Sequence, residues 1–125
     1  MIITKVEAIH CALPYSYHRP AASGRSSGWP TIDTLLIRIE TDEGVEGWGE
    51  AFGFMSCART RRAVETLIAP LCIGKDARDI AGLTDEVTRK LHNYGRSGAV
   101  AYGLSGIDIA LWDIAGKIAG QPIYR

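Results

Sequence analysis

Hydrophobic side chains follow a helical spacing through the last part of the chain, residues 97–125. Large apolar residues recur there at steps of three and four, which stacks them along one side of an α-helix: Val100, Leu104, Ile107, Leu111, Ile114 and Ile118. A second line at similar steps holds only small residues: Ala99, Gly103, Gly106 and Ala110. Glycine inside a helix costs about 1 kcal/mol relative to alanine, so this line indicates that another element packs very close. We therefore predict a helix over residues 97–119, contacted on two sides and ended by Gly120 and Pro122.

The first half of the chain has the pattern of β-strands. Three segments are rich in β-branched residues or lie beside a turn, and we predict strands at 2–13, 34–41 and 45–51. Gly44 stands in the turn of the hairpin, at a position that needs a positive φ. Gly47 and Gly49 lie two apart in the returning strand and leave one of its faces bare. We expect a helix or another backbone to approach that face closely.

Two further helices are predicted between the hairpin and the last helix. Ser56 is expected to cap a helix that ends near Pro70, and Asp79 to cap the next. The second of these has an apolar line made of Ile80, Leu83, Val87, Leu91 and Tyr94. Strands followed by helices indicate an α+β fold: a three-stranded antiparallel meander sheet followed by a three-helix bundle. At 125 residues the chain is expected to form one domain, residues 1–125.

Charge and composition exclude several classes of protein. Fourteen basic and fourteen acidic side chains leave no net charge, so we expect no nucleic-acid partner. No segment approaches the roughly 18 apolar residues of a membrane span, and the first residues lack the pattern of a signal peptide, which predicts a cytoplasmic protein without membrane association. Three widely spaced cysteines without a Cys-x-x-Cys pair predict free thiols rather than disulfides or a zinc site: Cys11, Cys57 and Cys72.

The charged motifs do not predict a catalytic centre in this chain. Gly44, Gly47 and Gly49 do not form a phosphate loop, because three glutamates crowd them: Glu43, Glu46 and Glu50. Asp108 and Asp113 point some 140° apart on a helix, and Asp113 is expected to pair with Lys117. No Lys-x-Lys motif and no convincing set of three metal-binding carboxylates occurs. We therefore predict neither catalytic residues nor a metal site here.

Three strings of residues resemble the N-terminal domain of the mandelate racemase and muconate lactonizing enzyme family, within the enolase superfamily. They are Gly-Ile-Asp-Ile-Ala-Leu-Trp-Asp-Ile-Ala-Gly-Lys at 106–117 with Gln-Pro-Ile-Tyr at 121–124, Thr-Asp-Glu-Gly-Val-Glu-Gly-Trp-Gly-Glu at 41–50, and Ile-Gly-Lys-Asp at 73–76. The tryptophan before Asp113 and the Gly-Lys pair after it resemble the mandelate racemase branch more closely.

The resemblance implies a capping domain whose partner is a C-terminal (β/α)₈ barrel. Such a barrel takes about 250 residues, so it is absent from this chain. The parent enzyme would be a lyase or isomerase that removes the proton α to the carboxylate of a small-molecule substrate, as an acid-sugar dehydratase or hydroxy-acid racemase, in a homo-oligomer. Its Mg²⁺ and catalytic groups are implied to lie on the barrel, so the fragment alone is expected to be inactive. A stand-alone protein-interaction module, or a truncated remnant, is the alternative.

Two segments are the candidate substrate-specificity loops. Residues 14–30 combine three prolines, two glycines and four serines with several aromatic and cationic side chains, and residues 51–56 are mostly apolar. In the resembled family, the corresponding loops close over the active site of the barrel. That position makes six side chains candidates for substrate contact: Tyr15, His18, Arg19, Trp29, Phe54 and Met55. A solvent-exposed connection whose aromatic residues pack locally is the alternative for residues 14–30.

Overall fold

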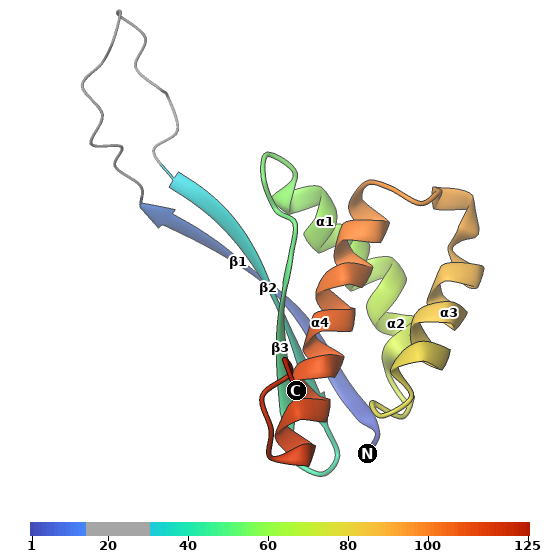
Figure 1. The fold of residues 1–125 in the computed structure, drawn as a ribbon. Coiled ribbons are helices and arrows are strands. Elements are labelled where there is room, and N and C mark those ends of the chain that lie inside the picture. Colours follow the sequence, from blue (N-terminus) through green and yellow to red (C-terminus); the bar gives the residue numbers. More distant parts are fainter. Residues whose placement is uncertain (15–30) are drawn as a thin grey trace, which may run out of the picture.

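The computed structural model describes residues 1–14 and 31–125. In this part, three antiparallel strands in the order β1-β2-β3 precede the helices (Figure 1). The elements are β1 (Ile3–Pro14), β2 (Thr31–Thr41), β3 (Glu46–Ala51), α1 (Cys57–Ala63), η1 (Val64–Ile68), α2 (Ala69–Cys72), α3 (Ile80–Lys90), η2 (His92–Tyr94) and α4 (Ala99–Ala119). Segments α1, η1 and α2 run on without a break, so the bundle has three helices. The predicted α+β fold is confirmed.

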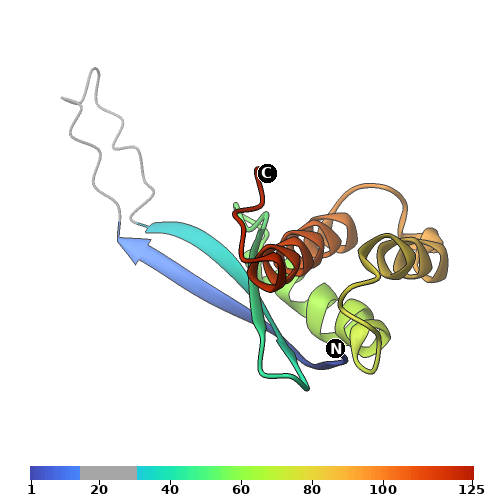
Figure 2. The same cartoon turned by 60° about the horizontal axis from the view of Figure 1, so that its bottom comes forward.

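The helices cover one face of the sheet, as Figure 2 shows. Side chains of β2 alternate between buried and half-buried along its second half, and Leu35, Ile37 and Ile39 have no exposed surface. Ile37 lies opposite Ala8 on one side and Gly49 on the other, so all three residues face the helices. The hairpin turn closes as predicted, with Gly44 at a φ of 78°. The period-two pattern therefore places a one-sided sheet against the bundle.

Glycines bring α4 into direct contact with the sheet. A Cβ atom placed on Gly49 would lie 2.8 Å from the backbone nitrogen of Ala110, and one on Gly106 would lie 2.8 Å from the Cβ of Ala51. On the other side of α4, a Cβ on Gly103 would lie 2.8 Å from a methyl group of Val64 in η1. Real Cβ atoms do not approach other atoms so closely. The close contacts expected at the glycines of both strand and helix are thus confirmed.

The apolar line of α4 forms the centre of the core, with two departures from the predicted pattern. Ile107, Leu111 and Ile114 are completely buried, whereas Leu104 is only half-buried and Ile118 is 48% exposed. Leu104 lines an open groove between α3 and α4. The Lys117 ammonium group contacts the carbonyl of Glu46, the first residue of β3. Ile118 follows Lys117 and therefore lies past the end of the sheet surface that α4 covers. The apolar spacing of α4 thus continues beyond the part of the helix that has a surface to pack against.

The helix ends correct the sequence prediction in three places. The first helix passes through Pro70 and ends at Cys72, two residues beyond the proline that was expected to stop it. The wide π-type turns of η1 directly before Pro70 accommodate a residue that lacks an N–H group and would clash with the carbonyl of an ordinary helix. Ser56 occupies the N-cap position without capping: its hydroxyl group is buried and has no hydrogen-bond partner within the described residues. The last helix begins at Ala99, two residues later than predicted.

Other predicted ends are correct. The Asp79 carboxylate accepts a hydrogen bond of 3.0 Å from the backbone N–H of Gly82 and caps α3. Gly120 ends α4 in the left-handed conformation, with a φ of 61°. The apolar line of α3 is buried at Leu83 and Val87, whereas Tyr94 is exposed in η2. None of the helices in the described part of the chain is long and apolar enough to cross a bilayer.

Candidate functional site

The loop between β3 and α1, residues 52–56, is held at both ends by the core. The Phe52 carbonyl accepts a hydrogen bond of 3.2 Å from the hydroxyl group of Thr60, which is itself completely buried. Gly53 leaves little room for a larger residue, since a Cβ there would lie 3.2 Å from the Cys57 sulfur. The Ser56 N–H donates to the Gly53 carbonyl and closes a turn. The scaffold therefore fixes the path of this loop.

Apolar side chains project from this anchored loop into solvent. Phe52, Phe54 and Met55 are 52%, 44% and 80% exposed. Met55 has a φ of 52°, a left-handed conformation that costs a non-glycine residue about 1 kcal/mol or more. A loop that only connects a strand to a helix needs neither exposed aromatic rings nor a non-glycine residue with a positive φ. The loop thus has the character of a contact surface.

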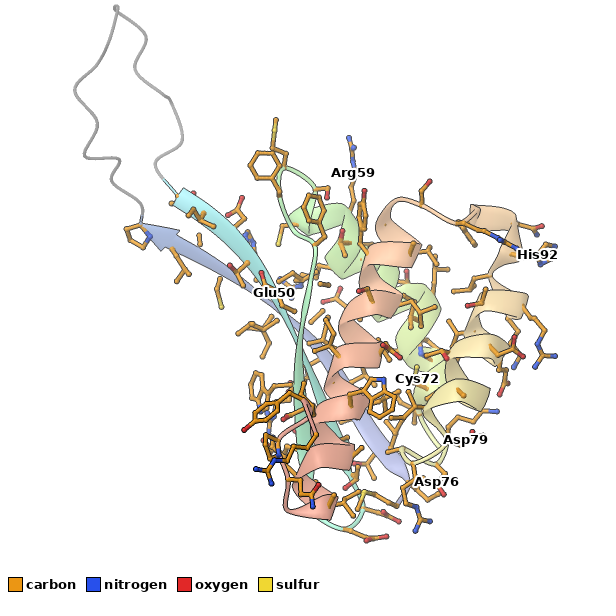
Figure 3. All side chains as sticks on the ribbon, viewed as in Figure 1. Glu50, Arg59, Cys72, Asp76, Asp79 and His92 are labelled. Atoms are coloured by element: carbon orange, nitrogen blue, oxygen red, sulfur yellow. The ribbon has the colours of Figure 1, made fainter. Side chains whose placement is uncertain are left out.

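Aromatic packing ties the loop to the start of α4. The Phe52 ring lies 4.8 Å from the Tyr102 ring, centre to centre, and 6.4 Å from the Phe54 ring. Both pairs are tilted, as aromatic pairs prefer. Arg59, in the first helical turns after the loop, lies at the same end of the domain (Figure 3). This end of the domain combines an apolar surface with a nearby cation, which suits contact with an organic anion.

Of the six predicted specificity residues, the structure describes two. Phe54 and Met55 lie on the exposed loop, as expected. The other four, Tyr15, His18, Arg19 and Trp29, lie outside the described residues. The strands on either side of that stretch end at Pro14 and Thr31, which pair with each other. The last residue of β3, Ala51, pairs with Leu35, which is in the same half of β2 as Thr31. Both predicted loops are therefore attached at the same end of the sheet.

Two residues near this end were not singled out as a pair from the sequence. The His10 Nε2 atom and the Asp33 Oδ1 atom are 2.9 Å apart, and both side chains are about one-third exposed. Their contact joins β1 to β2 across the sheet. Only the strand register brings them together, since 22 residues separate them in the chain. Arg59 was not singled out from the sequence either, and its position directly after the apolar loop is the signal that could have done so.

Charged residues on the outer face of the sheet form a network of ion pairs. The Arg38 guanidinium contacts the carboxylates of Glu7, Glu40 and Glu46 at 3.0, 2.9 and 2.6 Å. Lys5 adds a second cation, 2.7 Å from Glu7. The hydrogen bond from Arg38 lowers the pKa of Glu46, and that from Lys5 lowers the pKa of Glu7. These ion pairs link side chains of β1, β2 and β3. The carboxylates therefore stabilise the sheet and do not form an acid–base pair.

The acidic residues of the signature near the chain end are structural as well. Asp113 and Lys117 form the predicted ion pair, at 2.6 Å. The Asp113 carboxylate also accepts a hydrogen bond of 2.9 Å from the Trp48 backbone N–H, and the Lys117 ammonium donates to the Glu46 carbonyl at 2.8 Å. Together they occupy the open edge of β3. Asp108 instead lines the groove towards α3, so the two aspartates do not converge.

Neither the cysteines nor the carboxylates of the described part form a reactive centre. Cys57 and Cys72 are buried and Cys11 is half-buried, all as free thiols. Burial raises the pKa of Cys72 to about 12, which keeps its thiol protonated at neutral pH. Within residues 1–14 and 31–125, no three His, Cys, Asp or Glu side chains could hold one metal ion. Figure 3 shows Glu50, Asp76 and His92 far apart, on the sheet, below α3 and beyond its other end.

Comparison with known proteins places this geometry in a family. The family model described as mandelate racemase / muconate lactonizing enzyme, N-terminal domain, matches residues 16–125. An arabinonate dehydratase of Saccharolobus solfataricus is 34% identical over 94 residues, which cover 75% of this chain and 25% of that protein. A D-galactonate dehydratase of Ralstonia nicotianae is 41% identical over 92 residues, covering 73% of this chain and 23% of that protein.

Solved structures agree with this assignment. A mandelate racemase/muconate lactonizing protein from Paracoccus denitrificans, complexed with magnesium, has a TM-score of 0.77 at 33% identity and matches 98% of this chain and 29% of its own. A member of the enolase superfamily from Agrobacterium tumefaciens has a TM-score of 0.83 at 26% identity, over 98% of this chain and 36% of its own. The chain therefore spans only about a quarter to a third of the length of these relatives.

Proposed function

Because this chain belongs to the mandelate racemase / muconate lactonizing enzyme family, as its N-terminal domain, we propose that it caps the active site of a longer enzyme and helps to select the substrate. The longer enzyme removes the proton α to the carboxylate of a sugar acid and releases water, and its catalytic groups lie on a C-terminal barrel. The 125-residue domain by itself is inactive.

The exposed loop 52–56 carries this proposal. Its backbone is anchored by Thr60 and Gly53 while Phe54 and Met55 remain open to solvent. A rigid apolar wall of this kind excludes water and restricts the shapes that fit beneath it, which is a closing role rather than a chemical one. In the same proposal, Tyr15, His18, Arg19 and Trp29 also contribute substrate contacts, with His18 and Arg19 offering hydrogen-bond donors.

The names of the relatives favour dehydration over racemisation. Two similar proteins are an arabinonate dehydratase and a D-galactonate dehydratase. Donors such as Arg19, and Arg59 beside the loop, suit a polyhydroxylated acid, whose carboxylate and hydroxyl groups accept hydrogen bonds. We therefore propose a sugar acid as the substrate class.

Magnesium enters this proposal only through the barrel. A relative's structure contains magnesium, but the described residues of this chain supply no cluster of ligands for it. The hard Mg²⁺ ion needs several oxygen ligands in octahedral geometry, and Glu7, Glu46 and Asp113 are already paired with Lys5, Arg38 and Lys117. In this proposal the described residues of the domain do not bind the metal.

The first test is to read the gene beyond Arg125 and then to measure turnover of the encoded protein on a panel of sugar acids. Phe54→Ala and Met55→Ala should lower kcat/KM for the best substrate about tenfold or more, because each removes part of the wall over the substrate. Ile73→Ala is the matched control, since Ile73 is also apolar and 50% exposed but belongs to the link after α2. Unfolding temperatures should change by less than about 4 °C in all three variants, since each of these side chains is at least 44% exposed.

Two results would contradict the proposal. A gene without a barrel after Arg125 would favour a stand-alone interaction module. A barrel enzyme in which both loop variants retain the kcat/KM of the Ile73→Ala control would show that the loop does not face the substrate.

A further inference from the structure

An open groove lies between α3 and α4, which run side by side in Figure 1. It has a volume of about 420 Å³, and five apolar residues line it: Val87, Leu91, Val100, Ala101 and Leu104. Leu91, Ala101 and Leu104 are only half-buried, although they lie where the two helices face each other. The helices therefore leave apolar surface open to solvent between them, and contiguous apolar surface of this kind marks a contact site.

Two charged residues, Arg96 and Asp108, also line this groove. Arg96 lies in the link before α4, and Asp108 lies in the third turn of that helix, where it is half-buried. Neither has an ion-pair partner within residues 1–14 and 31–125, whereas the other charged residues of the two helices are paired: Asp85 with Arg89, Glu86 with Lys90, and Asp113 with Lys117. A carboxylate that is partly removed from water is stabilised by an opposite charge nearby. The groove thus offers one cation and one anion to a partner.

The positions of these two charges match those of a second copy of the chain. Because a two-fold axis makes every contact occur twice, two antiparallel copies of α4 face each other at residue numbers that add up to a constant. When the axis lies at the level of residue 102, Arg96 of each copy faces Asp108 of the other. The same register places Val100 opposite the partner's Leu104 and sets the small Ala101 beside the axis, where two helices can approach closely. A single register therefore pairs both charges and covers apolar lining of the groove.

We propose that a second copy of this chain docks in the groove between α3 and α4, with the two α4 helices antiparallel. Two ion pairs between Arg96 and Asp108, one at each end of the contact, fix the register, and Leu104 of each copy packs on the apolar lining of the other. Such a contact is isologous and closes after two copies. The described lining of the groove includes no residue of the loop 52–56, so this dimer does not depend on the function proposed above.

Sedimentation equilibrium of the 125-residue chain measures this association directly, and we expect a reversible dimer at concentrations below about 1 mM. Arg96→Asp and Asp108→Arg each place like charges opposite each other at both ends of the contact, so each should weaken the dimer about tenfold or more. Arg96 is exposed, so its replacement leaves the core untouched. The double variant restores both ion pairs with the charges exchanged, and its dissociation constant should return to within about threefold of that of the natural chain.

Cross-linking supplies a second readout, and Arg62 supplies the control for both. Arg62 is an exposed arginine of α1 outside the lining of the groove, so Arg62→Asp should change the dissociation constant less than about twofold. In a Cys11→Ser background the two remaining thiols are buried. Ala101→Cys should then form a disulfide between two copies on mild oxidation, because residues beside the axis come within the reach of such a bond. Arg62→Cys in the same background should not.

Four results would overturn the proposal. The chain could stay monomeric up to about 1 mM, the dimer could survive both single charge reversals, or the double variant could associate no better than the single ones. Equal disulfide formation by Ala101→Cys and Arg62→Cys would show that the copies meet through another surface or by random collision.

Discussion

Replacing Gly106 by alanine sets two effects of opposite sign against each other. Alanine inside a helix is about 1 kcal/mol more favourable than glycine. Against this, the new methyl group would lie 2.7 Å from Cγ1 of Ile37, 2.8 Å from Cβ of Ala51 and 3.0 Å from the Ala51 backbone nitrogen. Carbon atoms prefer a separation of about 3.5–4.0 Å, so each carbon contact is too short by about 1 Å.

The clash should exceed the gain in helix propensity. Overpacking a close-packed core costs about 1–3 kcal/mol, and the backbone of Ala51 cannot rotate away as a flexible side chain can. We expect Gly106→Ala to destabilise the domain by about 1–2 kcal/mol after the propensity gain is subtracted. The measurement is urea unfolding of the 125-residue chain, followed by circular dichroism.

Two variants control this experiment. Ser105→Ala raises helix propensity one residue earlier, on an exposed position, and should be neutral or stabilising by about 0.5 kcal/mol. Adding Ala51→Gly to Gly106→Ala removes one of the clashing carbons, so the double variant should be more stable than the two separate effects predict. If Gly106→Ala stabilised the domain as Ser105→Ala does, α4 and β3 would not be in the close contact described here.

Three further predictions concern the core, the loop and the response to pH. Leu111→Ala should cost about 2–5 kcal/mol, because Leu111 is completely buried at the centre of α4, and an unchanged urea midpoint would refute that position. Met55→Gly should stabilise the isolated chain by up to about 1 kcal/mol, because it relieves a positive φ at an exposed residue; destabilisation would mean that the Met55 side chain packs against the domain. Hydrogen bonds from Lys75 and Lys90 lower the pKa of Glu86 from 4.5 to about 2 in the folded state, so its contribution to stability is complete above pH 4.5 and is lost as the pH falls towards 2. Lys75→Met should therefore lower the urea midpoint at pH 7 and flatten its decline between these pH values, and an unchanged pH profile would contradict the assigned pairing.

Much of the fold could be predicted from the sequence, because the patterns report local geometry. The small residues of α4 and the bare face at Gly47 and Gly49 indicated a close contact before either partner was known, and the two sets pack against each other. The first helix runs two residues past Pro70, because the π-type turns before this proline depend on packing, which the periodicity does not report. Ile118 follows the same spacing but is 48% exposed, because a periodic pattern does not show where the opposing surface stops.

The candidate site could be predicted only in part. The apolar composition of the loop marked Phe54 and Met55, and the structure adds what composition cannot show: the anchoring by Thr60 and the packing of Phe52 on Tyr102. The pairing of His10 with Asp33 depends on strand register, which residue spacing does not reveal. Tyr15, His18, Arg19 and Trp29 remain predictions.

A crystal structure of the longer protein with a bound sugar acid would test the central claim most directly. The account predicts that a side-chain atom of Phe54 or Met55 lies within about 4.5 Å of the bound acid, the distance that defines apolar contact. A sugar acid bound in the barrel with both side chains more than about 10 Å away, beyond the reach of any direct contact, would contradict the assignment of this domain as the cap that selects the substrate.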